Sequence, residues 1–207
     1  MKNVIIILAL LSICIFSCNK ENENIPDNIM HYELNPQLEV TSVDSLINHP
    51  SGCGDIPFPS DTSASISLDI NNDGTNDFSL SCLSWYEFVS ASGPCANYNT
   101  SITISGTTEK NKISIQENYN TIKTFNFNDI IDDSYNWHEN ATLMLSSAQA
   151  PFSMNFDGSV YLGVKLKQAE EEYFGWLYIN KSDYLITVMS YAINQTTHNC
   201  IHAGQTE

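Results

Sequence analysis

The sequence predicts an all-β protein, an antiparallel β-sandwich of jelly-roll type with one short helical segment. Two observations lead to this prediction. Apolar residues alternate with polar ones over many short segments, which is the period-two pattern of half-buried strands. Asn, Gly, Ser and Asp separate these segments at short intervals, as in sandwiches and barrels.

Seven segments share this alternation and are the predicted strands: residues 63–70, 78–82, 102–104, 113–115, 160–166, 174–179 and 184–191. Gly106 to Asn111 has the composition of a hairpin loop. Residues 128–147 depart from the pattern and predict a helical turn or a short helix across one end of the sandwich, and residues 148–158 are predicted to be loop.

The N-terminus carries a targeting signal, because Lys2 is followed by an apolar run from Val4 to Phe16. This run is too short to span a bilayer as a helix. It ends in Ser17 just before Cys18, which resembles the lipobox of bacterial lipoproteins; the alternative is an ordinary secretory signal. The resemblance implies a signal peptide (residues 1–17), a lipidated flexible tether (18–29) and a single β-sandwich domain (30–207).

The polar, acidic stretch after Cys18 suits a solvated tether. Asn19 in place of aspartate implies, by the same resemblance, the outer membrane, and the acidic, Asn-rich stretch is similar to surface-export signals in some Gram-negative lineages. The lipid is the one predicted contact with the membrane.

The formal net charge of −16 restricts the partners. The chain contains eight lysines and no arginine. Phosphate binding needs clustered Lys and Arg, so a nucleic-acid partner is excluded and docking on anionic lipid is disfavoured. A glycan or protein partner stays open.

Four cysteines remain beyond the signal and Cys18, an even number that suits an oxidising compartment. Cys82 and Cys95 flank a turn-like segment, so we expect them to pair with each other and Cys53 to pair with Cys200, although three connectivities are open. A zinc site is the rival, but the sequence has no C-x-x-C pair.

One local motif carries metal chemistry. Calcium prefers six to eight oxygen ligands from alternate residues of a tight loop. Oxygen ligands at loop positions 1, 3, 5, 7 and 9, with Gly74 at position 6, predict a structural Ca²⁺ site formed by Asp69, Asn71, Asp73, the Thr75 carbonyl and Asp77.

This motif lacks the glutamate of an EF-hand, because position 12 is Leu80, and strands are predicted to flank it. A water, Asp55 or Asp61 could complete the shell. The alternative is an Asp-Gly hairpin turn that needs no metal.

Tryptophans and acidic groups give weaker signals. Trp85, Trp137 and Trp176 could stack on sugar rings, although such residues are more often core. Adjacent pairs such as His138-Glu139 and Asp132-Asp133 point to opposite faces of a strand, so no catalytic pair is predicted.

The arrangement of segments resembles a group of uncharacterised secreted bacterial β-proteins. The resemblance rests on five stretches: Asp69–Asp77, Tyr161–Val164, Phe174–Tyr178, Tyr191-Ala192 and Ile201–Gly204. It implies a fold and an extracytoplasmic address but no reaction. The sequence therefore predicts a non-enzymatic outer-membrane or cell-surface lipoprotein whose calcium-stabilised sandwich is a binding or interaction module. A carbohydrate-binding accessory lipoprotein is the alternative, and a glycan-processing hydrolase is the least favoured.

Overall fold

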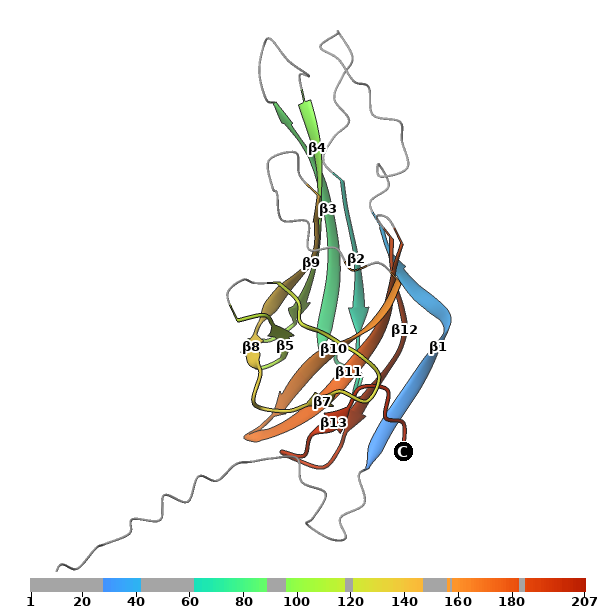
Figure 1. Ribbon diagram of the computed structural model, residues 1–207, viewed down its shortest axis with the longest axis vertical. Helices are drawn as coiled ribbons and strands as arrows, with labels where there is room; N and C mark the ends of the chain where they lie inside the picture. The colour runs from blue at the N-terminus through green and yellow to red at the C-terminus, as the bar shows by residue number, and fades with distance from the viewer. Residues whose placement is uncertain are drawn as a thin grey trace, which may run out of the picture.

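The computed structural model describes residues 28–41, 62–88, 96–117, 121–146, 156, 158–182 and 185–207. These residues form thirteen strands and no helix, so the all-β prediction is confirmed. No helix among them is long and apolar enough to cross a membrane. The strands lie in two main antiparallel sheets, consistent with a β-sandwich (Figure 1).

The larger sheet has the order β1-β12-β11-β10-β5-β8, and β6 also pairs with β10. Its strands are β1 (Ile29–Val40), β5 (Lys112–Ile115), β6 (Thr124–Phe125), β8 (Asn136–His138), β10 (Gly158–Gln168), β11 (Glu171–Ser182) and β12 (Leu185–Asn194). The smaller sheet has the order β2-β3-β4-β9, with β2 (Thr62–Leu68), β3 (Phe78–Phe88), β4 (Ala96–Gly106) and β9 (Asn140–Ser146). A two-stranded ribbon joins β7 (Ile130–Ile131) to β13 (Ile201–His202).

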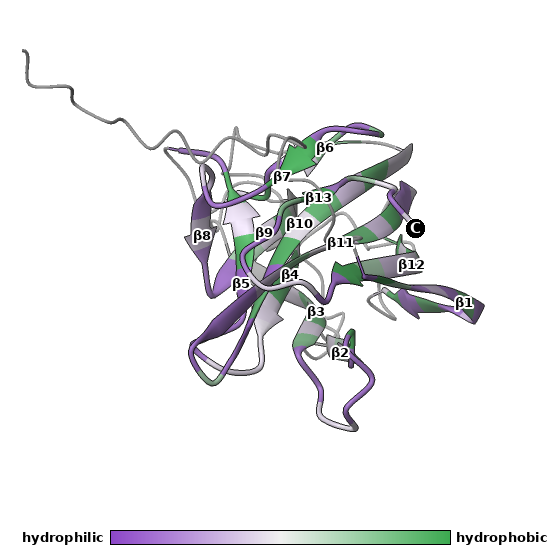
Figure 2. Ribbon diagram, turned by 90° about the horizontal axis from the view of Figure 1, so that it is seen from below, coloured by the Kyte–Doolittle hydropathy of each residue, from purple (hydrophilic) through white to green (hydrophobic). Residues whose placement is uncertain are grey.

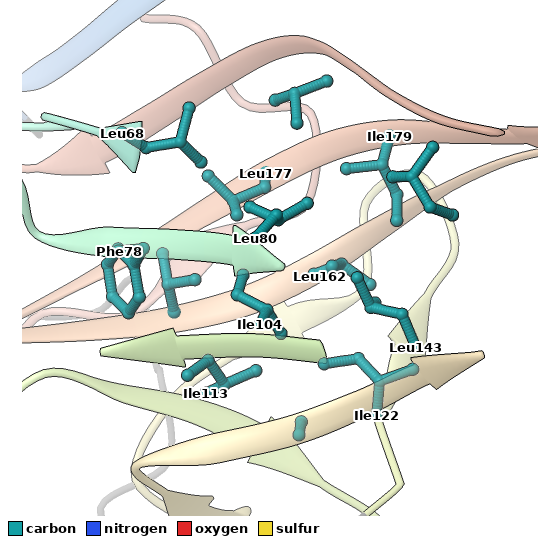
Figure 3. Close-up of a cluster of buried hydrophobic side chains, with 14 of the residues drawn as sticks. Leu68, Phe78, Leu80, Ile104, Ile113, Ile122, Leu143, Leu162, Leu177 and Ile179 are labelled. Carbon is teal, nitrogen blue, oxygen red and sulfur yellow. The ribbon is translucent and has the colours of Figure 1, made fainter. Parts of the chain in front are cut away.

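The main core lies between the inner faces of the two sheets. Alternate residues of β2, β3 and β4 point inward and are buried, for example Leu68, Leu80 and Ile104. They belong to one apolar cluster with Leu162 of β10 and Leu177 of β11 (Figure 3). Burying each such side chain stabilises the fold by about 1.5–3 kcal/mol, so this contact fixes which face of every strand is inward.

A second apolar cluster covers part of the outer face of the larger sheet. Phe174 and Trp176 of β11 pack there against Phe125 of β6 and against Ile201 at the start of β13. Figure 2 shows alternating apolar and polar bands along β10 and β11. A strand that is buried on both faces needs apolar residues at consecutive positions, because alternate residues point to opposite faces. The strand β11 has such a run, since Phe174, Gly175, Trp176 and Leu177 are all buried.

The expected helix in residues 128–147 is wrong, because the described part of this segment contains β7, β8 and β9. Ala141 and Leu143 are buried while Thr142 between them is half-buried, which is the alternation of a strand. Asn128 takes a positive φ of 71°, which is incompatible with a continuous helix at this point.

The structure contains a strand, β1, where the sequence predicts none, since the first predicted strand begins at residue 63. It pairs with β12 with a register shift between Glu33 and Leu38, and Asn35-Pro36 is a cis peptide bond. This irregularity interrupts the period-two pattern that identifies a strand in the sequence.

The two leucines of β3 provide a matched test of the inward and outward faces. Leu80 is fully buried and Leu83 is 48% exposed. Leu80→Ala should lower the free energy of unfolding by about 2–5 kcal/mol, because it removes apolar contacts and leaves a cavity. Leu83→Ala should change it by about 0.5 kcal/mol or less. Urea unfolding of both variants measures this difference, and equal losses would contradict the assigned register.

Candidate calcium site

The predicted calcium loop joins β2 to β3 and contains residues 69–77. Its turn relies on two residues with positive φ, Asn72 at 58° and Gly74 at 86°. Gly and Asn are the residues that adopt this left-handed conformation at least cost. The Asn-Asp-Gly sequence therefore allows the chain to reverse tightly between two strands that pair from Leu68 and Phe78 onward.

The first three predicted ligands turn their oxygens toward the backbone amides of the loop. Asp69 accepts from the amides of Asp73 (3.2 Å) and Gly74 (2.8 Å). Asn71 accepts from the amide of Asp73 (3.0 Å), and Asp73 accepts from the amide of Thr75 (2.8 Å). These bonds bring three oxygen-bearing side chains to the inside of one turn. Each carboxylate oxygen has more than one lone pair, so a hydrogen bond does not prevent it from also binding a cation.

Asp77 closes the base of the loop. Its side chain is only 6% exposed. It accepts from the amide of Ile70 (2.9 Å) and from the side chain of Asn111 (3.4 Å). Its backbone carbonyl accepts from the amide of Thr107 (2.8 Å) and again from Asn111 (3.1 Å). Asp77 thus ties the β2–β3 loop to the turn between β4 and β5.

The loop concentrates negative charge. The pKa of the Asp77 carboxyl is raised from 3.8 to about 6, mainly by burial; the hydrogen bond from Ile70 opposes this shift, and the charges of Asp73 and Asp69 add to it. The pKa of Asp73 is lowered, first by the hydrogen bond from the Thr75 amide and then by that from Asn71. A bound divalent cation would offset the repulsion among the three carboxylates.

The full ligand set remains a prediction. Within the described residues, no group of three or more His, Cys, Asp or Glu is arranged to hold a metal ion. Asp55 and Asp61, named above as possible extra ligands, lie outside the described residues. The structure therefore supports the shape of the loop and the inward turn of its first three side chains.

Three distant residues also support the loop, and sequence reasoning missed them. Gln168 donates to Asp73 (3.3 Å), and the Tyr191 hydroxyl donates to the carbonyl of Asp69 (3.1 Å). Asn111 contacts Asp77 as described above. The first two lie 95 and 122 residues from their partners, and nothing in their local sequence indicates the contact.

The three tryptophans lie in different environments. Trp176 is 2% exposed, packs against Tyr161 and His31, and donates to the carbonyl of Gln205 (3.1 Å), so it is a core residue. Trp137 is half-buried, with the Lys165 ammonium 5.2 Å from its ring centroid. Trp85 is half-buried on β3, in the other sheet. The structure does not combine them into one stacking platform.

Among the described residues, Lys165 is a buried charged residue, as are Asp77 and Lys181. Its ammonium bonds Asp133 (2.8 Å) and Glu172 (3.2 Å) and lies beside the rings of Trp137 and Phe174. These two carboxylates compensate for the lost hydration of the Lys165 ammonium, so its burial is explained by structure and does not indicate a binding site. It connects the β7–β8 segment to the outer face of the larger sheet.

The structure describes two of the four predicted disulfide cysteines. Cys200, between β12 and β13, is disulfide-bonded. Cys82 is fully buried in the main core. Cys53 and Cys95 lie outside the described residues, as does the predicted lipidation site Cys18, so the connectivity stays a prediction.

Comparisons with known proteins do not assign the chain to a family. No family model matches the chain, and searches of curated proteins and of solved structures also found no match.

The buried Asp77 should make the calcium-free protein less stable as the pH rises. Its folded-state pKa of about 6 exceeds the ordinary 3.8, so the folded chain holds this proton more tightly than the unfolded chain. The associated stabilisation is complete below about pH 3.8 and is lost as the pH rises through about 6. With a chelator present, Asp77→Asn should therefore gain stability relative to the unsubstituted protein between about pH 4 and about pH 7.

Urea unfolding at several pH values measures this gain. Asparagine keeps an oxygen that can accept from Ile70. Glu109→Gln, at an exposed carboxylate in the neighbouring turn, controls for the loss of one surface charge. A relative stability of Asp77→Asn that stays constant or falls with rising pH would contradict the raised pKa.

Proposed function

We propose that this chain is a lipid-anchored protein of the outer membrane or cell surface, with a calcium-stabilised β-sandwich that is a non-catalytic binding module. The Cys18 motif supports the anchor by its resemblance to a lipobox. The disulfide at Cys200 suits the oxidising exterior that such an anchor implies. The net charge of −16 suits a solvated domain held to the membrane by acyl chains alone.

One observation carries the calcium part of the proposal. Asp69, Asn71 and Asp73 turn inward around a single Gly74-containing turn, at the alternate spacing that a calcium shell needs. Asp77 anchors the same turn at its base, where it is buried next to the other carboxylates. Calcium would neutralise these charges and hold the β2–β3 connection, so its proposed role is structural.

Calcium should raise the melting temperature of the protein. At a free concentration about 100 times the dissociation constant, one site adds about 2.7 kcal/mol. For a chain of this size that corresponds to a rise of roughly 5–10 °C. Asp73→Asn should lose most of the rise, whereas Glu109→Gln should keep it. Melting curves that overlay in calcium and in chelator would sink the calcium proposal.

The lipid anchor can be tested with two neighbouring cysteines. In bacterial cells given radioactive palmitate, the protein should become labelled and Cys18→Ala should remove the label. Cys14→Ala lies within the same apolar segment and should leave labelling intact, so it controls for damage to the signal. Labelling that persists in Cys18→Ala would refute the assignment of this residue.

A carbohydrate-binding accessory role is the second candidate. One observation favours it: β3 presents the half-buried Trp85 and the 48% exposed Leu83 on one face of the smaller sheet. Aromatic and apolar side chains on an open face are suited to stacking against sugar rings. Trp176 does not contribute to this role, because its ring is buried.

A further inference from the structure

The outer face of the smaller sheet is an ordered array of hydroxyl groups. Figure 1 shows β2, β3, β4 and β9 side by side. Their register places hydroxyl side chains opposite one another in rows across the sheet. We call this surface the hydroxyl face, and its members are Ser63, Ser65, Ser67, Ser79, Ser81, Ser101, Thr103, Ser105 and Thr142.

The face is open to solvent and carries no charge at its described positions. The three serines of β2 are exposed, and those of β3 and β4 are half-buried. Leu83, Leu145 and Asn140 complete these rows, none of which contains Asp, Glu or Lys. In a chain with a net charge of −16, these rows of the sheet therefore carry no charge. Glu87, opposite Asn97, comes two residues after Trp85 on β3.

An unsatisfied amide lies at one end of this face. Asn99 of β4 pairs with Trp85 of β3 and is only 1% exposed. Within the described part of the chain, neither its amide nitrogen nor its oxygen has a hydrogen-bond partner. Buried polar groups are normally hydrogen-bonded, so an orphaned amide beside a half-buried indole points to a polar ligand that reaches this position.

We propose that the hydroxyl face, together with Trp85 and Leu83, binds a neutral polysaccharide. This inference rests on the proposed binding module and names its partner. Serine and threonine hydroxyls both donate and accept, as sugar hydroxyls do. Neighbouring strands are about 4.8 Å apart and alternate residues of one strand about 6.8 Å apart, so the rows form a regularly spaced array along which an extended glycan chain can lie.

Two features favour this partner over others. An acidic polysaccharide would be repelled by the net charge of −16, whereas a neutral one would not. A protein partner fits less well, because protein interfaces are depleted in serine and enriched in aromatic residues, Met and Arg. The apolar contacts of Trp85 and Leu83 would fix one end of the glycan.

Affinity electrophoresis of the full-length protein in detergent tests this inference. Native gels would contain laminarin, xyloglucan or galactomannan as neutral polymers and alginate as an acidic one. At least one neutral polymer should retard the protein, and alginate should not. Ser81→Glu, at the centre of the hydroxyl face, should weaken that retardation at least tenfold. Ser182→Glu, at an exposed end of β11, should not change it.

A gentler double variant guards against misfolding. Ser81→Ala with Thr103→Val removes two paired hydroxyls without adding charge, and it should also weaken retardation while the melting temperature stays within a few degrees. The proposal is overturned if no neutral polymer retards the protein, if alginate retards it more strongly, or if Ser81→Glu binds as well as the unsubstituted protein. Each of these results is independent of palmitate labelling and of calcium-dependent melting, which test the proposed function.

Discussion

The apolar contact between the two sheets determines where every other feature of the molecule lies. Leu68, Leu80 and Ile104 must face inward, and in a strand this choice fixes the side of every neighbouring residue. The hydroxyl groups of β2, β3 and β4 are therefore on the outside, and the acidic loop is at the end where β2 meets β3. A slip of one residue would bury a row of serines and expose the leucines.

The packing of β2 and β3 buries an acidic side chain of the loop that joins them. Asp77 precedes Phe78, the first inward residue of β3, so its carboxylate is drawn into the edge of the core. Hydrogen bonds from Ile70 and Asn111 compensate for part of its lost hydration, yet its pKa remains raised. The protein thus holds a buried carboxylate next to Asp69 and Asp73, which is unfavourable by itself; a cation bound by the loop would offset this repulsion.

The sequence predicted the local pattern well and the long-range contacts poorly. Period-two runs such as Ser63–Ile70 and Val160–Leu166 became β2 and β10, because alternation depends only on neighbouring residues. The turn at Gly74 was predictable for the same reason. The helix expected in residues 128–147 was wrong, because short strands there are held by partners far along the chain, such as Ile201 opposite Ile131. The contacts of Tyr191 and Gln168 with the loop join residues that are far apart in the sequence, so no local pattern predicts them.

Hydrogen exchange at the amides of Asp73, Gly74 and Thr75 measures whether the inward-turned acidic side chains form an ordered loop, suited to a cation, on a strand register fixed by the core. These three amides should be protected, since each donates to a side chain of the loop, and calcium should slow their exchange further. If these amides exchange at the rate of an unfolded peptide, with and without calcium, while the paired amides of β3 stay protected, the loop is not ordered by these hydrogen bonds and does not bind calcium.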